Sequence, residues 1–392
     1  MVAAVIVDAV RTPGGKRNGK LAGWHPVDLS AEVLRSLVSR NDLDPAVVDD
    51  VIMGCFSQVG DQALNIGRNA VLAAGFPESV PATTVDRQCG SSQQALHFAA
   101  QGIMAGAYEV AIAAGVESMS RLPIGASIGT GMGFPFGPSV SERYAPVGGL
   151  VSQGIAAEMV ADKWHLSREA LDEFAARSQQ RAGAATTSGR FEREIVPLAV
   201  KDAHGHKTGE ILRTDEGIRP DTTSETLASL RPAFKPDGKL TAGNSSQISD
   251  GASAILLMSE ARAVRLGLRP RARLVEFAVV GVDPVTMLTG PIPATTKVLG
   301  RAGMSLCDID LVEINEAFAS VVLAWVEEHH PDLDRVNVNG GAIALGHPVG
   351  ASGAKLMATL LCELERSGGH YGLETMCEGG GLANATIIER LA

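Results

Sequence analysis

The chain has 392 residues, of which 45% are hydrophobic and 20% are charged, the composition of an ordinary globular protein with two or three domains. This composition excludes long disordered segments. The net charge of −10 disfavours general binding to nucleic acid or to an anionic membrane, although a local basic patch can still hold a phosphate group.

The N-terminal segment and the cysteine content indicate a soluble cytoplasmic protein. Residues 2–9 are apolar apart from Asp8 and have no basic region before them, so they predict a first β-strand rather than a signal peptide. No apolar run approaches the roughly 20 residues that a membrane-spanning helix needs. The 5 cysteines form no C-x-x-C pair, which indicates free thiols in a reducing compartment.

Strands and helices alternate in the first part of the chain. Period-2 and apolar stretches predict strands, and an apolar stripe at helical spacing predicts a helix. The predicted elements are, in order, a strand, a helix, two strands, a helix that begins near Cys89 and a further strand: residues 2–7, 29–38, 49–55, 80–85, 89–103 and 109–115. This alternation predicts an α/β domain with a largely parallel sheet.

Residues 120–244 have a different character. Gly and Pro are crowded into residues 121–150, most densely at 129–138, and this excludes long regular elements there. A capped helix follows from Ser167, and residues 201–236 are polar and rich in loops. We interpret this portion as an insertion into the α/β scaffold and expect it to form a lid over a site.

The last part of the chain repeats the pattern of the first. Residues 308–314 resemble residues 48–54, and residues 350–356 followed by 372–376 resemble the helix at Cys89 and the strand after it. Two similar α/β halves would place the equivalent helices back to back. We therefore expect the turns at the N-termini of these two helices to meet.

Cys89 is the first candidate for chemistry, because it lies on the predicted turn between a strand and a helix. Unpaired backbone N–H groups and the positive end of a helix dipole favour a thiolate at such a turn, and the thiolate is the reactive form. Gly90 lets a substrate approach the backbone closely. The alternative is that Cys89 is a small buried hydrophobic residue, as most single cysteines are.

His347 is the second candidate, since Gly, Pro and Gly around it hold it in a turn before a predicted helix. A neutral imidazole there can accept a proton from a nearby thiol and so activate a cysteine. The alternative is a structural or surface histidine.

Two further stretches carry polar groups that suit catalysis. Cys377 precedes three glycines after Glu378, where backbone N–H groups can be presented to an oxyanion. Asn315 and Glu316 place an amide and a carboxylate at a predicted strand end. The alternatives are a tight turn with a buried cysteine and an ordinary helix N-cap.

Taken together, these stretches resemble the thiolase family over the whole length of the chain. Five motifs match the family in order and spacing, and they are Gln88-Cys89-Gly90-Ser91, Thr241-Ala242-Gly243-Asn244-Ser245-Ser246, Asn315-Glu316-Ala317-Phe318, Asn339-Gly340-Gly341-Ala342-Ile343-Ala344-Leu345-Gly346-His347-Pro348 and Cys377-Glu378-Gly379-Gly380-Gly381. Several motifs in fixed order are a highly specific signal.

The resemblance implies an α/β protein with a five-layered αβαβα fold of two duplicated halves and an inserted loop domain. It places the N-terminal half at residues 1–119 plus about 245–270, the loop domain at 120–244 and the C-terminal half at 271–392.

By the same resemblance, Cys89 is the acylated nucleophile and His347 is its activating base. Cys377 is the thiol that removes a proton from the α-carbon of acetyl-CoA or returns one to it. Asn315 holds a water that stabilises the thioester enolate together with His347, and the N–H groups of Cys89 and Gly379 bind the oxyanion of the acyl-enzyme.

Coenzyme A is the implied co-substrate, and no prosthetic group or metal is expected. The resemblance places its pantetheine near Ser246 and its adenine near Arg219, although Arg219 can equally be a solvated loop charge. It also implies a homodimer or homotetramer that acts in fatty acid metabolism and β-oxidation, with no nucleic-acid or membrane partner.

The preferred acyl chain is left open by the sequence. Short-chain biosynthetic members have a His-Met pair where this chain has Ser152 and Gln153, whereas Met287 matches the short-chain pattern. The loop with Phe134 and Phe136 either lines a longer acyl channel or covers a contact between subunits.

The sequence therefore predicts an acyltransferase that interconverts acyl-CoA plus acetyl-CoA with 3-ketoacyl-CoA plus CoA. Cleaving such a thioester requires a nucleophile at the ketone and an acid at the departing enolate, and two thiols serve both ends. The alternatives are a decarboxylative condensing enzyme on a related fold, which the second cysteine Cys377 disfavours, and a non-catalytic acyl-CoA or lipid-binding relative.

Overall fold

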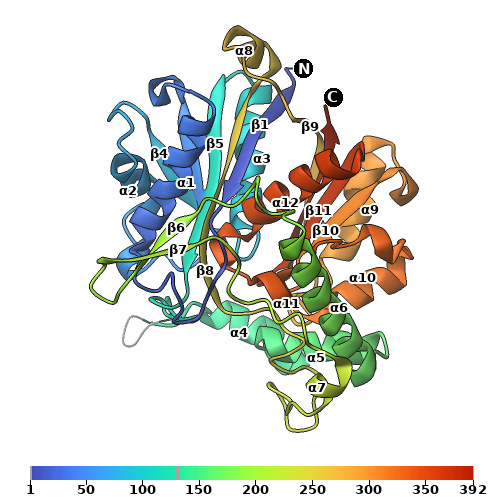
Figure 1. Cartoon of the computed structure of the whole chain (residues 1–392). Coiled ribbons are helices and arrows are strands. Elements are labelled where there is room, and N and C mark those ends of the chain that lie inside the picture. Colours follow the sequence, from blue (N-terminus) through green and yellow to red (C-terminus); the bar gives the residue numbers. More distant parts are fainter. Residues whose placement is uncertain (1, 129–132, 392) are drawn as a thin grey trace.

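One mixed sheet passes through the whole computed structural model, which describes residues 2–128 and 133–391. Its 10 strands lie in the order β10-β11-β12-β9-β1-β8-β5-β3-β4, with the short β2 paired to β8 (Figure 1). Their bounds are β1 Ala4–Arg11, β2 Gly15–Lys16, β3 Asp50–Gly54, β4 Ala82–Val85, β5 Val110–Ser118, β8 Ser249–Ser259, β9 Ala272–Gly281, β10 Leu311–Ile314, β11 Tyr371–Glu378 and β12 Leu382–Arg390.

The strand order confirms the duplication expected from the sequence. Outward from the centre of the sheet, β1, β8, β5 and β3 on one side correspond to β9, β12, β11 and β10 on the other. The two halves meet along a short antiparallel pairing in which Val5 lies opposite Arg273 and Ile6 opposite Ala272. Each half is therefore one copy of the same unit.

The expectation of a largely parallel sheet is wrong. Only β3 with β4, β3 with β5 and β10 with β11 are parallel, and the other named pairs in the large sheet are antiparallel. In the C-terminal half the reason is the short glycine turn at residues 379–381, because two strands joined by so few residues can pair only antiparallel.

Helices cover both outer faces of the sheet and fill the space between its halves. The helices that pack against strands or against one another in the two halves are α1 Pro26–Arg40, α2 Ile66–Ala73, α3 Ser91–Met104, α9 Pro291–Ala302, α10 Ala319–His329 and α12 Ser352–Ser367. The central pair, α3 and α12, packs together, with α1 and α2 outside one half and α9 and α10 outside the other (Figure 1). The result is the five-layered αβαβα arrangement.

The central helices are buried on most sides because their apolar residues are not confined to one stripe. Ala95, Leu96 and Ala99 of α3 pack in the same cluster as Met357 and Leu361 of α12. A helix that is apolar on most faces belongs inside a protein rather than at its surface. This packing places the N-termini of α3 and α12 side by side.

The remaining elements belong mainly to the insertion between β5 and β8. They are α4 Pro138–Tyr144, α5 Gln153–Lys163, α6 Arg168–Thr187, β6 Leu198–Lys201, β7 Lys207–Leu212 and α7 Ser224–Ala228, while α8 Glu260–Arg265 and α11 Ala342–Leu345 lie outside it. The helices α4 to α7 lie across one end of the two halves (Figure 1). Part of the glycine-rich stretch at residues 129–138 lies outside the described residues. In the part of the chain that the structure describes, no helix is long and apolar enough to cross a membrane.

Candidate active site

Cys89 lies on the turn between β4 and α3, as the sequence predicts. Gly90 is the N-cap of α3, and Gln88 adopts a left-handed backbone conformation with φ 52°. The sulfur is buried, and the side-chain amide of Gln153 and the backbone N–H of Gly379 are donors near it that act to lower the pKa of the thiol. Gln88 carries strain that its neighbours must hold in place, and such strain is typical of reactive turns.

Burial is the largest influence on the pKa of Cys89. Removal from water and the neighbouring Glu378 raise the pKa of the Cys89 thiol to about 12. This effect opposes the thiolate that the helix N-terminus favours. The hydrogen bonds to the sulfur oppose the shift but do not reverse it. A neutral thiol can attack a thioester only if a base takes its proton during the attack.

His347 is the candidate for such a base, and its tautomer follows from its neighbours. Its Nδ1 lies 2.6 Å from Oγ of Ser352, and that hydroxyl donates its single proton to the carbonyl oxygen of Pro348 at 2.9 Å. Nδ1 must therefore carry a hydrogen and donate it to Ser352. The lone pair of Nε2 is left free to accept a proton.

The electrostatic surroundings keep the imidazole of His347 neutral. Burial, assisted by the charge of Lys355, lowers the pKa of His347 to about 3. A neutral thiol and a neutral imidazole are thus held in one site, instead of the ion pair of a thiolate with an imidazolium. Proton transfer between them has to accompany the chemistry.

The turns that carry Cys89 and His347 are brought together by α3 and α12. The backbone N–H of Ala354 donates to Oγ of Ser92 at 3.0 Å, which joins the first turns of the two helices. Val349, two residues after His347, packs in the same apolar cluster as Cys89. Residues more than 250 positions apart in the chain therefore meet at these helix ends.

Cys377 approaches from the end of β11, opposite Ala383 of β12. It is fully buried, and burial, together with the neighbouring ionisable groups of Cys89 and Glu378, raises its pKa well above the ordinary value. The turn that follows requires glycine, since Gly380 and Gly381 have φ 80° and 81°. This turn directs the N–H of Gly379 at the sulfur of Cys89.

Asn315 lies directly after β10 and points at His347. Its Nδ2 is 3.5 Å from Nε2 of His347, and its Oδ1 is buried with no hydrogen-bond partner among the described residues. It is not a helix cap, because the N-cap of α10 is Phe318 and makes no side-chain bond. Glu316 instead accepts a hydrogen bond from Ser178 in the insertion at 2.6 Å.

The two residues expected to contact coenzyme A are placed differently. The backbone N–H of Ser246 donates to the carbonyl oxygen of Ala317 at 2.9 Å, so Ser246 lies beside the segment that carries Asn315. Arg219 is exposed on the insertion, and its backbone N–H donates to Oε1 of Gln179 at 2.7 Å. The structure brings Ser246 to the site but leaves the guanidinium of Arg219 at the surface.

Two residues of the site were not singled out from the sequence as functional. Gln153 is noticeable in the sequence only as a departure from a His-Met pair, yet its amide acts on the pKa of Cys89. Ser352 gives no sequence signal beyond its position five residues after His347. The described residues contain no group of three or more His, Cys, Asp or Glu that could hold a metal ion, and all 5 cysteines are free thiols.

Comparison with known proteins decides the family. Residues 4–261 match the family model described as "Thiolase, N-terminal domain", and residues 268–390 match "Thiolase, C-terminal domain". The chain belongs to the thiolase family. As a thiolase it is an enzyme, an acyltransferase.

Curated relatives extend over the full length of this thiolase. It is 52% identical to the steroid 3-ketoacyl-CoA thiolase FadA6 of Mycobacterium tuberculosis, with 100% of this chain and 95% of the relative covered. It is 50% identical to a 3-ketoacyl-CoA thiolase of Serratia proteamaculans, with 99% of each covered.

Solved structures share its fold. The acetyl-CoA acetyltransferase of Bacillus anthracis has a TM-score of 0.90 at 41% identity, and the human mitochondrial 3-ketoacyl-CoA thiolase has a TM-score of 0.90 at 39% identity. Each comparison covers 100% of this chain and 99% of the solved one.

Proposed function

We propose that this thiolase interconverts acyl-CoA plus acetyl-CoA with 3-ketoacyl-CoA plus CoA through an acyl group carried on Cys89. The observation that carries the proposal is the meeting of two buried cysteines in one site. Met376, next to Cys377, packs in the same apolar cluster as Cys89, and a Cβ added to Gly90 would lie 1.8 Å from Oε1 of Glu378. One sulfur can hold the acyl group while the other exchanges a proton with the α-carbon.

In the first half-reaction, the Cys89 sulfur attacks the carbonyl carbon of the thioester or ketone. Nε2 of His347 takes the thiol proton, so that no free thiolate has to persist in the buried site. When the adduct of a thioester collapses, its carbon–sulfur bond breaks and the CoA sulfur leaves with the proton from Nε2. When the adduct of a ketone collapses, the bond between the α and β carbons breaks and the enolate of acetyl-CoA takes a proton from Cys377. The negative charge that develops on the carbonyl oxygen is stabilised by backbone N–H groups at Cys89 and Gly379. One donor of this kind is typically worth about 10² to 10³ in rate.

In the second half-reaction, Cys377 removes a proton from the α-carbon of acetyl-CoA, or returns one to it in the cleavage direction. The enolate oxygen that forms needs a donor on the other side of the site. A water molecule held by the unpartnered Oδ1 of Asn315 supplies this donor, and His347 adds a second donor in the state in which Nε2 carries a proton.

In this proposal the insertion at residues 120–244 covers the acyl-CoA site. The N-terminal half consists of residues 1–119 plus about 245–270, and the C-terminal half consists of residues 271–392. Ser246 contacts pantetheine and Arg219 contacts the adenine end. The acyl group lies against the apolar cluster that contains Cys377, Met287 and Phe318.

Assembly into a homodimer or homotetramer in the cytoplasm is also part of the proposal. Phe134 and Phe136 are 67% and 46% exposed and pack against each other with ring centroids 5.4 Å apart, which fits a covered contact between subunits or the mouth of an acyl channel. Size-exclusion chromatography coupled to light scattering measures the assembly directly.

Mass spectrometry after incubation with acetyl-CoA tests the proposed roles of the two cysteines. The wild-type chain is expected to gain one acetyl group on Cys89, and Cys89→Ala to gain none. Cys377→Ala is expected to gain the acetyl group but to form no acetoacetyl-CoA. An acetyl adduct in Cys89→Ala would refute the assignment of the nucleophile.

A thiolysis assay with acetoacetyl-CoA and a longer 3-ketoacyl-CoA separates the reaction from its alternatives and measures the acyl preference. Loss of the substrate enolate absorbance that depends on CoA supports thiolysis. Binding without turnover of either substrate would support a non-catalytic relative.

A further inference from the structure

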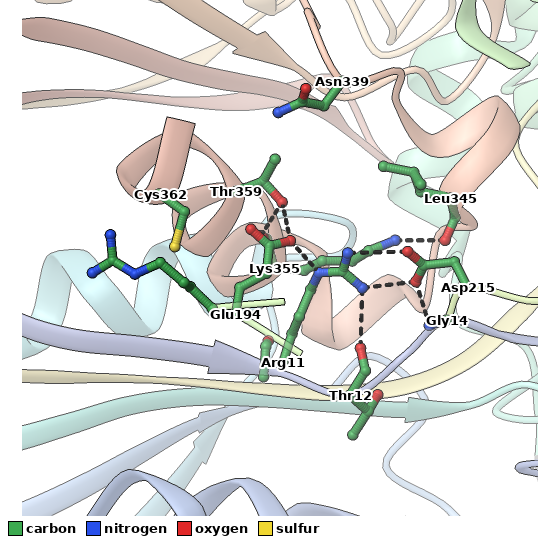
Figure 2. A network of polar contacts seen from close by, with 12 residues as sticks. Arg11, Thr12, Gly14, Glu194, Asp215, Asn339, Leu345, Lys355, Thr359 and Cys362 are labelled. Carbon is green, nitrogen blue, oxygen red and sulfur yellow. Dashed lines mark hydrogen bonds and ion pairs between the residues drawn. The ribbon is translucent and has the colours of Figure 1, made fainter. Parts of the chain in front are cut away.

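Lys355 is a buried lysine directly behind the turn that carries His347. It lies in α12, three residues after Ser352. Its Nζ donates to the carbonyl oxygens of Leu345 at 2.6 Å and of Gly346 at 2.9 Å, and the residue is 5% exposed. Figure 2 shows the lysine reaching from α12 to this backbone. These two carbonyl groups belong to the two residues that precede His347.

The backbone held by Lys355 can otherwise rotate. Gly346 has φ 80° and ψ 161°, a conformation that residues with a side chain rarely adopt. A glycine at this point is a flexible joint immediately before the imidazole. The two hydrogen bonds from the ammonium group fix the orientation of the peptide groups on both sides of that joint.

Lys355 also belongs to a buried charged network that joins the two halves to the insertion (Figure 2). Arg11 at the end of β1 pairs with Glu194 at 2.6 Å and with Asp215 at 2.7 Å, both in the insertion. Thr359, one turn after Lys355, donates to Glu194 at 2.8 Å. A buried ammonium group is costly unless charges and hydrogen bonds compensate it, and this network supplies the compensating charges.

We propose that Lys355 is a positioning residue, which holds the Nε2 atom of His347 in place for proton transfer by clamping the carbonyl groups of Leu345 and Gly346. Ser352 and Lys355 are three residues apart on α12 and therefore lie on one face of the helix. Ser352 fixes the ring through Nδ1, and Lys355 fixes the backbone before it. The inference rests on the proposed role of His347 as the base.

The charge of Lys355 acts on the same imidazole. It adds to the effect of burial in lowering the pKa of His347. The groups whose charges act on Lys355 are Asp215 and Glu194 from the insertion, Arg11 from β1 and Glu313 from β10. The cationic lysine thus opposes protonation of Nε2, the state in which His347 cannot act as a base.

The fall in the rate of Cys89 acetylation at low pH, which is the acid limb of the pH profile, distinguishes a positioning role of Lys355 from a purely structural one. We would mix each protein with acetyl-CoA between pH 5 and 9 and follow the acetyl adduct by quenched-flow mass spectrometry. The wild-type rate is expected to show no acid limb within this range. In Lys355→Met the rate at pH 7 falls about 100-fold, and the acid limb moves upward by about two pH units or more, from below pH 5 into the measured range.

Two matched variants make the result specific. Lys355→Arg keeps a cation with several donors, and its rate is expected within about threefold of wild type with no acid limb. Thr359→Val perturbs the same network without touching the His347 turn, and it is expected to leave the limb where it is. A folded Lys355→Met with a wild-type profile, or an equal movement of the limb in Thr359→Val, would overturn the proposal.

The remaining outcomes are also decisive. If Lys355→Met does not fold, Lys355→Arg provides the test, because a folded arginine variant with a loss of about 100-fold contradicts a clamp that a second cation can form. If the wild-type chain itself gains no acetyl group, the proposed function fails. If the wild-type chain is acetylated and Lys355→Met is acetylated at the same rate with the same pH profile, only the role of Lys355 fails.

Discussion

At the scale of single residues, burial has the largest effect on the pKa values of Cys89 and His347. The pKa of the thiol is raised to about 12, while that of His347 is lowered to about 3. Both groups are therefore neutral at rest. Hydrogen bonds to the sulfur from Gln153 and Gly379 favour the thiolate, so they become strongest when the proton leaves.

Replacement of Gln153 tests this account. Gln153→Met keeps the length of the side chain but removes the donor to the sulfur. A hydrogen bond to a charged group is worth about 1.5 kcal/mol or more, so alkylation of Cys89 by iodoacetamide at pH 8 is expected to slow about tenfold. Alkylation of the exposed Cys307 in the same sample is the internal reference. An unchanged ratio of the two rates would contradict a role for the amide.

At the scale of elements, the close approach of α3 and α12 depends on a glycine. A Cβ at Gly353 would lie 2.3 Å from the backbone nitrogen of Gln93 and 2.8 Å from its Cα. Backbone atoms cannot move aside as the end of a flexible side chain can. The small residue therefore sets the distance between the two helices, and with it the distance between the turns at Cys89 and His347.

The pair Gly353→Ala and Gly300→Ala measures the effect of this contact. Gly353→Ala is expected to lower the free energy of unfolding by about 2–3 kcal/mol, because it forces the helices apart, and to slow acetylation of Cys89. Gly300 lies in the outer helix α9 with nothing within 4 Å of an added Cβ. Gly300→Ala is expected to stabilise the protein by about 0.5–1 kcal/mol. Urea unfolding of both variants measures the sign of each change in the free energy of unfolding. Equal changes in the two variants would contradict a special role of the contact at Gly353.

At the scale of the whole molecule, the stability of the fold depends on carboxyl groups that it buries. Glu313 of β10 lies opposite Glu374 of β11, and both oxygens of Glu374 have no partner among the described residues. Burial and the neighbouring Glu313 raise the pKa of Glu374 well above 4.5. The folded state therefore holds a proton that the unfolded chain has already lost.

The sign of the pH dependence follows from this difference. The stabilisation is fully present below the unfolded pKa of 4.5 and is lost as the pH rises towards the raised pKa of the folded state, with a slope of up to about 1.4 kcal/mol per pH unit for one proton. Glu374→Gln is expected to reduce the loss of unfolding free energy between pH 5 and pH 9. The exposed Glu78→Gln is the control. A variant that loses as much stability as wild type would show that Glu374 is not responsible.

Much of the architecture was already predictable at the level of local pattern. The turns at Cys89, His347 and Cys377 could be predicted because the glycines next to these residues favour turns. The recurrence of similar segments predicted the two halves. The roles assigned to Cys89, His347, Cys377, Asn315 and Gly379 stay predictions that the proposed experiments test.

The sequence by itself determined the elements, the duplication and the candidate residues, because turn chemistry and apolar periodicity act between neighbours in the chain. Only the tertiary structure decided the antiparallel pairings, the tautomer of His347, the directions of the pKa shifts and the clamp made by Lys355. These depend on burial and on contacts between distant segments. The charge network behind His347 joins Arg11 of β1, Glu194 and Asp215 of the insertion and Lys355 of α12, and no local pattern brings these residues together.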